Sequence, residues 1–242
     1  CPTFGSLGHN INGGFAEFVR VKKEKVFHIP DYLSFNAAAL SEPVACCIHA
    51  VDRANIRYGD TVVIFGAGSM AQILGQLFKA SNAEKVYMIA GKSSKLELAA
   101  KYGIIPIEMD RNDYSVHEKA LLKENPLGVD LIIDATGSTK VISESMKLLK
   151  KGGTLLQYAI VHSGEKVEMD PVLMFNNELT YTASFCQSHN FGRAVDVLAS
   201  GIVDGDSLVT GEFPLDDFYK GLDENVKDRN SIKVIIHPNT EE

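Results

Sequence analysis

The sequence lacks an apolar run long enough to cross a bilayer, and its N-terminus lacks the charged-then-apolar pattern of a secretion signal. It also lacks an excess of basic residues, because 24 lysines and arginines against 31 acidic residues give a formal charge of −7. Nucleic acid and anionic membranes are therefore not expected as partners. Apolar residues make up 45% of the 242 positions, which is enough for a sizeable core. We expect a soluble, cytoplasmic protein.

Cysteine is scarce as well. The four cysteines, Cys1, Cys46, Cys47 and Cys186, show no metal-ligand spacing among themselves, and we expect no disulfide scaffold. Cys46 and Cys47 are adjacent in an apolar stretch, which is typical of small buried residues rather than of a redox pair. The histidines show no ligand spacing with one another either.

The middle of the chain alternates strand-like and helix-like segments. Residues 61–65 form a continuous apolar run, as expected for a strand that is buried on both faces. Further strands are predicted at 85–90, 104–107, 129–133, 154–159 and 180–185, and helices at 69–81, 95–102, 117–124 and 141–149. This alternation predicts an α/β fold with a doubly wound parallel sheet.

The two ends of the chain have a different pattern. The elements predicted there are two short strands within 13–30, a helical stretch over 31–53, a helix at 191–200, and strands at 208–213 and 232–236 around a helix at 215–225. We expect mostly antiparallel β structure at both ends. The parallel unit would then be inserted between two segments of a second domain.

The strongest local signal is Gly66-Ala67-Gly68-Ser69-Met70-Ala71, which lies directly between the first buried strand and a helix. Gly66 would permit the tight turn, Gly68 would let a pyrophosphate approach the backbone, and the small Ala71 would let the helix pack closely on the strand. The pyrophosphate would rest on the helix N-terminus, at the free amides around Ser69 and Met70. The motif predicts a nicotinamide dinucleotide cofactor.

The choice of cofactor depends on the end of the second strand. An NAD enzyme usually carries Asp or Glu there, to bind the ribose 2′-hydroxyl. This sequence has Ala90 at the strand end, followed after one glycine by Lys92, Ser93, Ser94 and Lys95. Hydroxyls and lysines favour a 2′-phosphate, so we expect NADP, with NAD possible. The alternative is a solvated polar turn that is indifferent to the phosphate.

A third loop follows the fourth strand. Ala135, Thr136 and Gly137 come directly after Asp134, at the carboxyl end of the strand, where the nicotinamide side of the site is expected. The alternative interpretation is a simple Asp/Gly turn.

The order of these motifs resembles the zinc-dependent medium-chain dehydrogenase/reductase family, specifically its polyol branch of sorbitol, xylitol and arabitol dehydrogenases. The segments that carry the resemblance are 13–18, 42–50, 184–204, 212–216 and 232–234, so it covers essentially the whole chain. The resemblance implies a Rossmann domain inserted in a partial, GroES-like catalytic domain. The expected division is a catalytic remnant at 1–45, the dinucleotide-binding domain at 46–188, and a return segment at 189–242.

The resemblance also assigns two residues to metal sites. Glu42 would lie at the catalytic zinc, as a ligand or one water away, and Cys1 resembles the last of four cysteines around a structural zinc. Taken alone, Glu42 is a helix-end residue before proline, and Cys1 is an unpaired thiol. The other ligands of the family precede the segment at 13–18 and are not found here. We therefore expect a truncated dehydrogenase that does no zinc chemistry by itself.

The implied activity is hydride transfer between a polyol or secondary alcohol and NADP(H) or NAD(H), with zinc stabilising the alkoxide in the intact enzyme. Two alternatives stay open. One is a zinc-independent quinone or enoyl reductase, against which Glu42 and Pro43 argue; the other is a catalytically silent NADP-binding module. The apolar, uncharged strand at 180–185 is a poor solvent-exposed edge, so it predicts a homodimer or homotetramer, unless a loop or another domain covers it.

Overall fold

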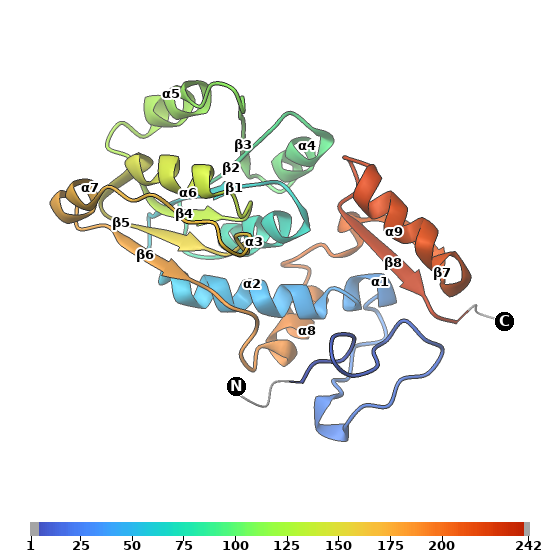
Figure 1. The fold of residues 1–242 in the computed structure, drawn as a ribbon. Coiled ribbons are helices and arrows are strands. Elements are labelled where there is room, and N and C mark those ends of the chain that lie inside the picture. Colours follow the sequence, from blue (N-terminus) through green and yellow to red (C-terminus); the bar gives the residue numbers. More distant parts are fainter. Residues whose placement is uncertain (1–4, 240–242) are drawn as a thin grey trace.

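The computed structural model describes residues 5–239, and a six-stranded parallel sheet forms its centre (Figure 1). The strand order is β3-β2-β1-β4-β5-β6. The strands are β1 (Thr61–Phe65), β2 (Lys85–Ala90), β3 (Ile105–Glu108), β4 (Val129–Asp134), β5 (Leu149–Gln157) and β6 (Thr180–Ala183). This order confirms the predicted doubly wound sheet. The chain adds strands on one side of β1 up to β3 and then returns to the other side at β4, and such folds bind their ligands at this switch point between β1 and β4.

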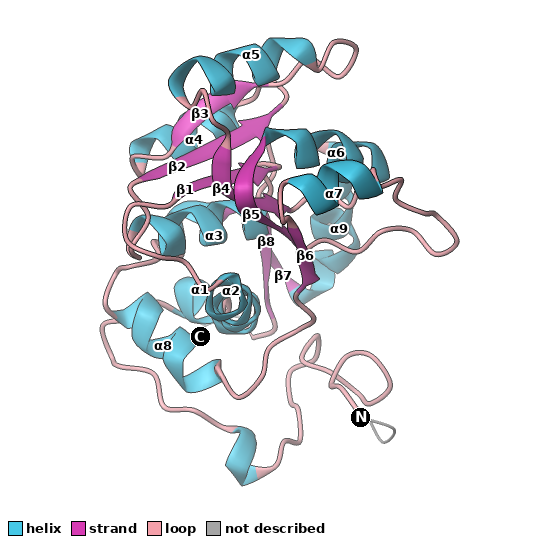
Figure 2. Ribbon diagram, turned by 90° about the vertical axis from the view of Figure 1, so that its left-hand side faces the viewer, coloured by secondary structure: helices cyan, strands magenta, loops and turns pink. Residues whose placement is uncertain are grey.

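Helices cover both faces of the sheet. The helices that connect the strands are α3 (Ser69–Lys79), α4 (Ser94–Lys101), α5 (Ser115–Glu124), α6 (Thr139–Ser145), which continues into η2 (Met146–Leu148), and α7 (Pro171–Asn176). Figure 2 shows α6 and α7 on one side of the sheet and α3 and α4 on the other. Strand β1 explains the two layers, because its side chains alternate: Val62 and Ile64 enter one apolar core, and Val63 and Phe65 enter the other.

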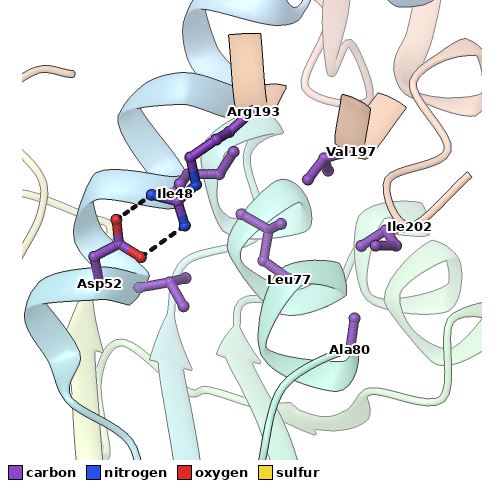
Figure 3. A pocket seen from close by; sticks show the side chains of 8 residues that line it. Ile48, Asp52, Leu77, Ala80, Arg193, Val197 and Ile202 are labelled. Carbon is purple, nitrogen blue, oxygen red and sulfur yellow. Dashed lines mark hydrogen bonds and ion pairs between the residues drawn. The ribbon is translucent and has the colours of Figure 1, made fainter. Parts of the chain in front are cut away.

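Helix α2 (Ser41–Ala54) joins the first part of the chain to the sheet, after the short α1 (Phe35–Ala38). It packs against α3 and against α8 (Phe191–Ala199). A shallow apolar pocket lies between the three helices, and the Asp52 carboxylate accepts hydrogen bonds of 2.5 and 2.9 Å from Arg193 at its rim (Figure 3). Both side chains of this ion pair are exposed, so we expect it to contribute at most about 1 kcal/mol.

The last part of the chain differs from the predicted antiparallel arrangement. Strands β7 (Val209–Pro214) and β8 (Lys233–His237) pair in parallel, and α9 (Phe218–Lys227) connects them, with η3 (Asp206–Leu208) before β7 and η4 (Leu215–Asp217) before α9. The antiparallel prediction was wrong although the helix between the two strands was itself predicted, because the effect of that helix on strand direction was not taken into account. A helical crossover carries the chain back to the start of the next strand and so makes the pair parallel.

The prediction for residues 13–30 was also wrong. That segment contains no strand, and its only regular element is the 3-10 helix η1 (Lys23–Lys25). Its apolar side chains lack a partner sheet: Phe15 and Phe18 are 66% and 89% exposed. Alternation of apolar residues is not sufficient for a strand when no neighbour supplies the backbone hydrogen bonds. Within residues 5–239, no helix is long and apolar enough to span a membrane.

A buried histidine makes the stability of the sheet dependent on pH. His117 in α5 is 1% exposed and packs edge-on against Phe65 and Tyr114, with ring centroids 5.8 and 5.2 Å apart. Removal from water lowers its pKa, and the nearby carboxylate of Glu118 only partly opposes this effect. The folded protein therefore holds the neutral ring.

We predict that acidification destabilises the wild type more than the variant His117→Leu. The unfolded histidine takes up a proton near pH 6.5, so stability is lost as the pH falls from there through the lower pKa of the folded state. Each unit of that difference costs about 1.4 kcal/mol. Thermal unfolding followed by circular dichroism between pH 7 and pH 5 measures the effect. Melting temperatures that fall in parallel for both proteins would contradict it.

Candidate functional site

Three loops meet at one edge of the sheet, where β1, β2 and β4 end. The amide of Gly66 donates to the carbonyl of Ile89 at 2.9 Å, and the amide of Ala135 donates to the carbonyl of Phe65 at 2.9 Å. The loops after these strands are therefore joined by backbone hydrogen bonds across the sheet. This edge brings together the three groups of residues that the sequence analysis singled out, as expected for the carboxyl ends of parallel strands.

The first loop has the shape of a phosphate cradle. Gly66 has a φ of 113°, and a Cβ on it would lie 3.0 Å from the carbonyl oxygen of Ala135. A Cβ on Gly68 would meet no atom within 4 Å, so space is open beside that residue. Helix α3 begins at Ser69 without a side-chain cap, which leaves the amides around Ser69 and Met70 available to an anion. These residues fit a dinucleotide pyrophosphate.

The second loop follows β2. Ala90 is buried, Lys92 and Ser94 are exposed, and Ser93 and Lys95 are half-buried at the start of α4. The Ser94 hydroxyl donates to the side-chain oxygen of Asn230 at 3.0 Å, so the turn between α9 and β8 touches this loop. Figure 1 shows that turn beside α4.

The third loop is supported by a buried carboxylate. Asp134 is fully buried, and it accepts hydrogen bonds from the amide and hydroxyl of Thr136, at 3.0 and 2.6 Å, and from the amide of Gly137 at 3.2 Å. Burial raises the pKa of Asp134, and these three hydrogen bonds act in the opposite direction. Gly137 has a φ of 71°, and a Cβ on it would overlap the carbonyl of Ile160. The loop from Ala135 to Gly137 is thus held in one conformation.

Glu42 lies in the first turn of α2 with an exposed side chain, and it accepts a hydrogen bond from the Cys46 thiol at 3.2 Å. Cys47 lies next to the phosphate loop: its thiol is 3.7 Å from the carbonyl of Met70 and 3.4 Å from the hydroxyl of Tyr158. Through these contacts, the start of α2 reaches the same edge of the sheet. Burial raises the pKa of Cys47 to about 12, and it also raises the pKa of Cys46 and the pKa of Tyr158. All three groups are therefore protonated at neutral pH.

The zinc ligands are not assembled in the described part of the chain. Between residues 5 and 239, no group of three or more His, Cys, Asp or Glu side chains could hold a metal ion. Cys1 lies outside the described residues. Glu42 offers one carboxylate, whereas a catalytic zinc takes three protein ligands. The described residues by themselves therefore do not fit a zinc site.

Two supporting residues, Gln72 and Asp134, were not predicted from the sequence. Gln72, on the buried face of α3, donates to the carbonyl of Lys95 at 2.7 Å and so links the first loop to the second. Asp134 was noted only as the residue before the third loop, but its carboxylate holds that loop together. A polar residue inside an otherwise apolar helix or strand is the sequence signal for both, although its partner is not visible in the sequence.

A polar cavity of about 520 Å³ lies at the opposite side of the sheet, where the strands begin. Asp130 is one of the residues in its wall; the carboxylate accepts from the amide of Thr61 at 3.0 Å and forms an ion pair with Lys150. These contacts connect the starts of β1, β4 and β5. We assign the cavity no role in binding the cofactor, because ligands of doubly wound sheets bind at the carboxyl ends of the strands.

Comparison with known proteins identifies the family of the chain. The sequence pattern of the family described as zinc-binding dehydrogenase matches residues 66–200, which include all three loops. The chain is 33% identical to D-arabinitol dehydrogenase 1 of Uromyces fabae over 241 residues, which are 99% of the chain and 68% of that enzyme. It is 30% identical to D-arabitol-phosphate dehydrogenase of Enterococcus avium, over 100% of the chain and 69% of that protein.

A solved structure gives the same result for the fold. A protein of Sinorhizobium meliloti 1021, assigned as a zinc-binding dehydrogenase and crystallised with NADP, superposes with a TM-score of 0.89 at 29% identity. The superposition covers 98% of this chain and 70% of that one. The parallel α/β fold and the resemblance predicted from the sequence are confirmed. The chain belongs to the family of zinc-binding dehydrogenases.

Proposed function

We propose that this chain binds NADP(H) at the carboxyl ends of its strands and, in the intact zinc-loaded enzyme, serves hydride transfer to or from a polyol or secondary alcohol. The observation that carries the proposal is that backbone hydrogen bonds join the carboxyl ends of β1, β2 and β4. Open space at Gly68 and the uncapped start of α3 lie there beside the loop at 135–137. The arabitol-type activities named for two relatives support the substrate class.

The chain's own residues would bind and orient the reactants. Amides around Ser69 and Met70 would hold the pyrophosphate, and the loop at 135–137 would fix the other end of the dinucleotide against the sheet. The bound nicotinamide supplies the hydride acceptor or donor. Glu42 is the proposed catalytic carboxylate, on the side of the site where α2 meets Tyr158. For Glu42 to act as a zinc ligand, two more protein ligands are required, and the described residues do not supply them.

We propose NADP over NAD because of the loop after β2. Two lysines and two serines stand at 92–95, and no carboxylate stands at Ala90. Lys92 is exposed and is available to a phosphate on the ribose, whereas the exposed Ser94 would have to exchange its hydrogen bond with Asn230 for one with the phosphate. The NADP in the Sinorhizobium structure supports this choice.

The wild-type chain is predicted to bind NADPH more tightly than NADH. The variant Ala90→Asp should shift the ratio of the two dissociation constants by about tenfold toward NADH, because a carboxylate there repels the 2′-phosphate and accepts from the 2′-hydroxyl. Fluorescence titration of both cofactors measures the ratio. Glu108→Gln is the control and should leave the ratio unchanged. Glu108 is the residue of β3 that pairs in register with Ala90, so this variant changes a carboxylate on the neighbouring strand. Equal affinities in the wild type would refute the preference.

A second prediction concerns the metal. The purified 242-residue chain should contain no stoichiometric zinc and should oxidise no polyol, because Glu42 has no second and third ligand among the described residues. Elemental analysis and a polyol assay with NADP test this. One firmly bound zinc per chain would overturn the prediction. Polyol oxidation without zinc would point to zinc-independent chemistry instead.

We further propose that the protein is cytoplasmic and forms a homodimer or homotetramer through β6. The amide of Ser184 donates to Gln157 of β5 at 3.0 Å, so the alternate residues Tyr181 and Ala183 direct their backbone groups to the open edge. Arg53 already donates to the carbonyl of Ala183 at 2.6 Å. A partner strand would therefore pair mainly at Tyr181.

The variant Thr182→Lys should convert an assembled protein into a monomer or a precipitate. The new charge would stand in the middle of the interface and beside Arg53, which donates to the Thr182 hydroxyl at 2.8 Å. Size-exclusion chromatography with light scattering measures the mass. Ile105→Lys, at the other edge of the sheet, should leave the assembly intact. A wild type that is monomeric and soluble would end the proposal of edge pairing.

A further inference from the structure

Gln72 is a polar residue on a buried helix face, one turn after the phosphate loop. Its side chain is fully buried, and its neighbours Ala71, Ile73 and Leu74 are buried and apolar. The amide must therefore be explained by its contacts.

Those contacts connect two of the three loops. The side-chain nitrogen of Gln72 donates to the carbonyl of Lys95 at 2.7 Å and lies 3.4 Å from the carbonyl of Ala67. Ala67 belongs to the phosphate loop, and Lys95 lies in the first turn of α4, directly after Lys92, Ser93 and Ser94. One buried amide thus spans the distance between the residues for the pyrophosphate and those for the ribose.

The side-chain amide of Gln72 carries an energetic cost, which indicates that the hydrogen bonds donated by its nitrogen are the reason for a glutamine at this position. The side-chain oxygen of Gln72 is buried and has no hydrogen-bond partner within residues 5–239. A buried polar atom without a partner is destabilising, so an amide is a poor choice for simple packing. The first turn of α4 is also held from outside, because Ser94 donates to Asn230 at 3.0 Å.

Gln76 lies one turn further along α3 and provides a matched comparison. It is 4% exposed, and its side-chain oxygen accepts from the amide of Asp204 at 2.8 Å. Its nitrogen is buried and has no partner in the described part of the chain. The two glutamines therefore share their helix, side chain and burial, but only Gln72 contacts the loops of the candidate site.

We propose that Gln72 is a positioning residue for cofactor selectivity. Its amide fixes the loop at 91–95 relative to the phosphate loop, so that one dinucleotide is bound at its pyrophosphate and at its 2′-phosphate together. The selectivity rests on the proposed use of NADP, whereas the fixed position of the loop does not. The residue acts through the two loops and not through contact with the reacting atoms.

The test compares Gln72→Met with Gln76→Met, since methionine keeps the volume and removes the amide. Hydrogen exchange of the free protein should become faster at residues 91–97 in the Gln72 variant and stay unchanged in the Gln76 variant. Titration should show the ratio of NADPH to NADH affinity reduced by about tenfold in that variant, and unchanged in the Gln76 variant. Asn230→Ala, an exposed change that removes the acceptor of Ser94 at the first turn of α4, should shift both readouts in the same direction by a smaller factor.

Several results would overturn the inference. Unchanged exchange at 91–97 in Gln72→Met would show that the amide does not hold the loop. Faster exchange with an unchanged affinity ratio would remove the role in selectivity, and equal effects in both glutamine variants would reduce Gln72 to a packing residue. A wild type without preference for NADPH would refute the proposed cofactor and the selectivity with it, whereas the exchange data would still decide whether Gln72 fixes the loop.

Discussion

Gly66 stands where β1 ends, and the backbone of Ala135 lies so close that no side chain fits between them. Its φ of 113° belongs to the region that favours glycine, and a Cβ would come within 3.0 Å of the Ala135 carbonyl oxygen. The hydrogen bonds from Gly66 to Ile89 and from Ala135 to Phe65 join the ends of three strands at the same place. Because this contact fixes β1 against β4 at the switch point of the sheet, the positions of all three candidate loops follow from it.

Each loop then has its own internal support. The phosphate loop leads into a helix start that no side chain caps, the buried Asp134 carboxylate holds the turn at Thr136 and Gly137, and Gln72 reaches across to α4. The groups expected to touch a cofactor are amides, hydroxyls and lysines at the surface, whereas the groups that hold them are buried. A site built on sheet ends in this way binds with little rearrangement, which favours accurate placement of two reactants.

The sequence was sufficient for the sheet and for the location of its loops, because buried parallel strands and glycine turns have strong local patterns. It was not sufficient where a partner decides the structure. The segment at 13–30 has the alternation of a strand but no neighbouring strand. The parallel pairing of β7 with β8, by contrast, follows from the helix between them, which the sequence did predict. The contact of Gln72 with Lys95 joins residues that are 23 positions apart, and no local pattern encodes it. Glu42 was assigned by resemblance, and its hydrogen bond with Cys46 became visible only in the structure.

The central claim is that the carboxyl edge of the sheet binds a nicotinamide dinucleotide. Backbone amide chemical shifts of the labelled 26.4 kDa chain, recorded during titration with NADPH, test it most directly. The account predicts saturable shifts at residues 66–70, 91–95 and 135–137, with the cavity around Asp130 at the opposite edge unaffected. Shifts centred on Asp130 and Lys150, or no saturable shift at the three loops, would contradict it.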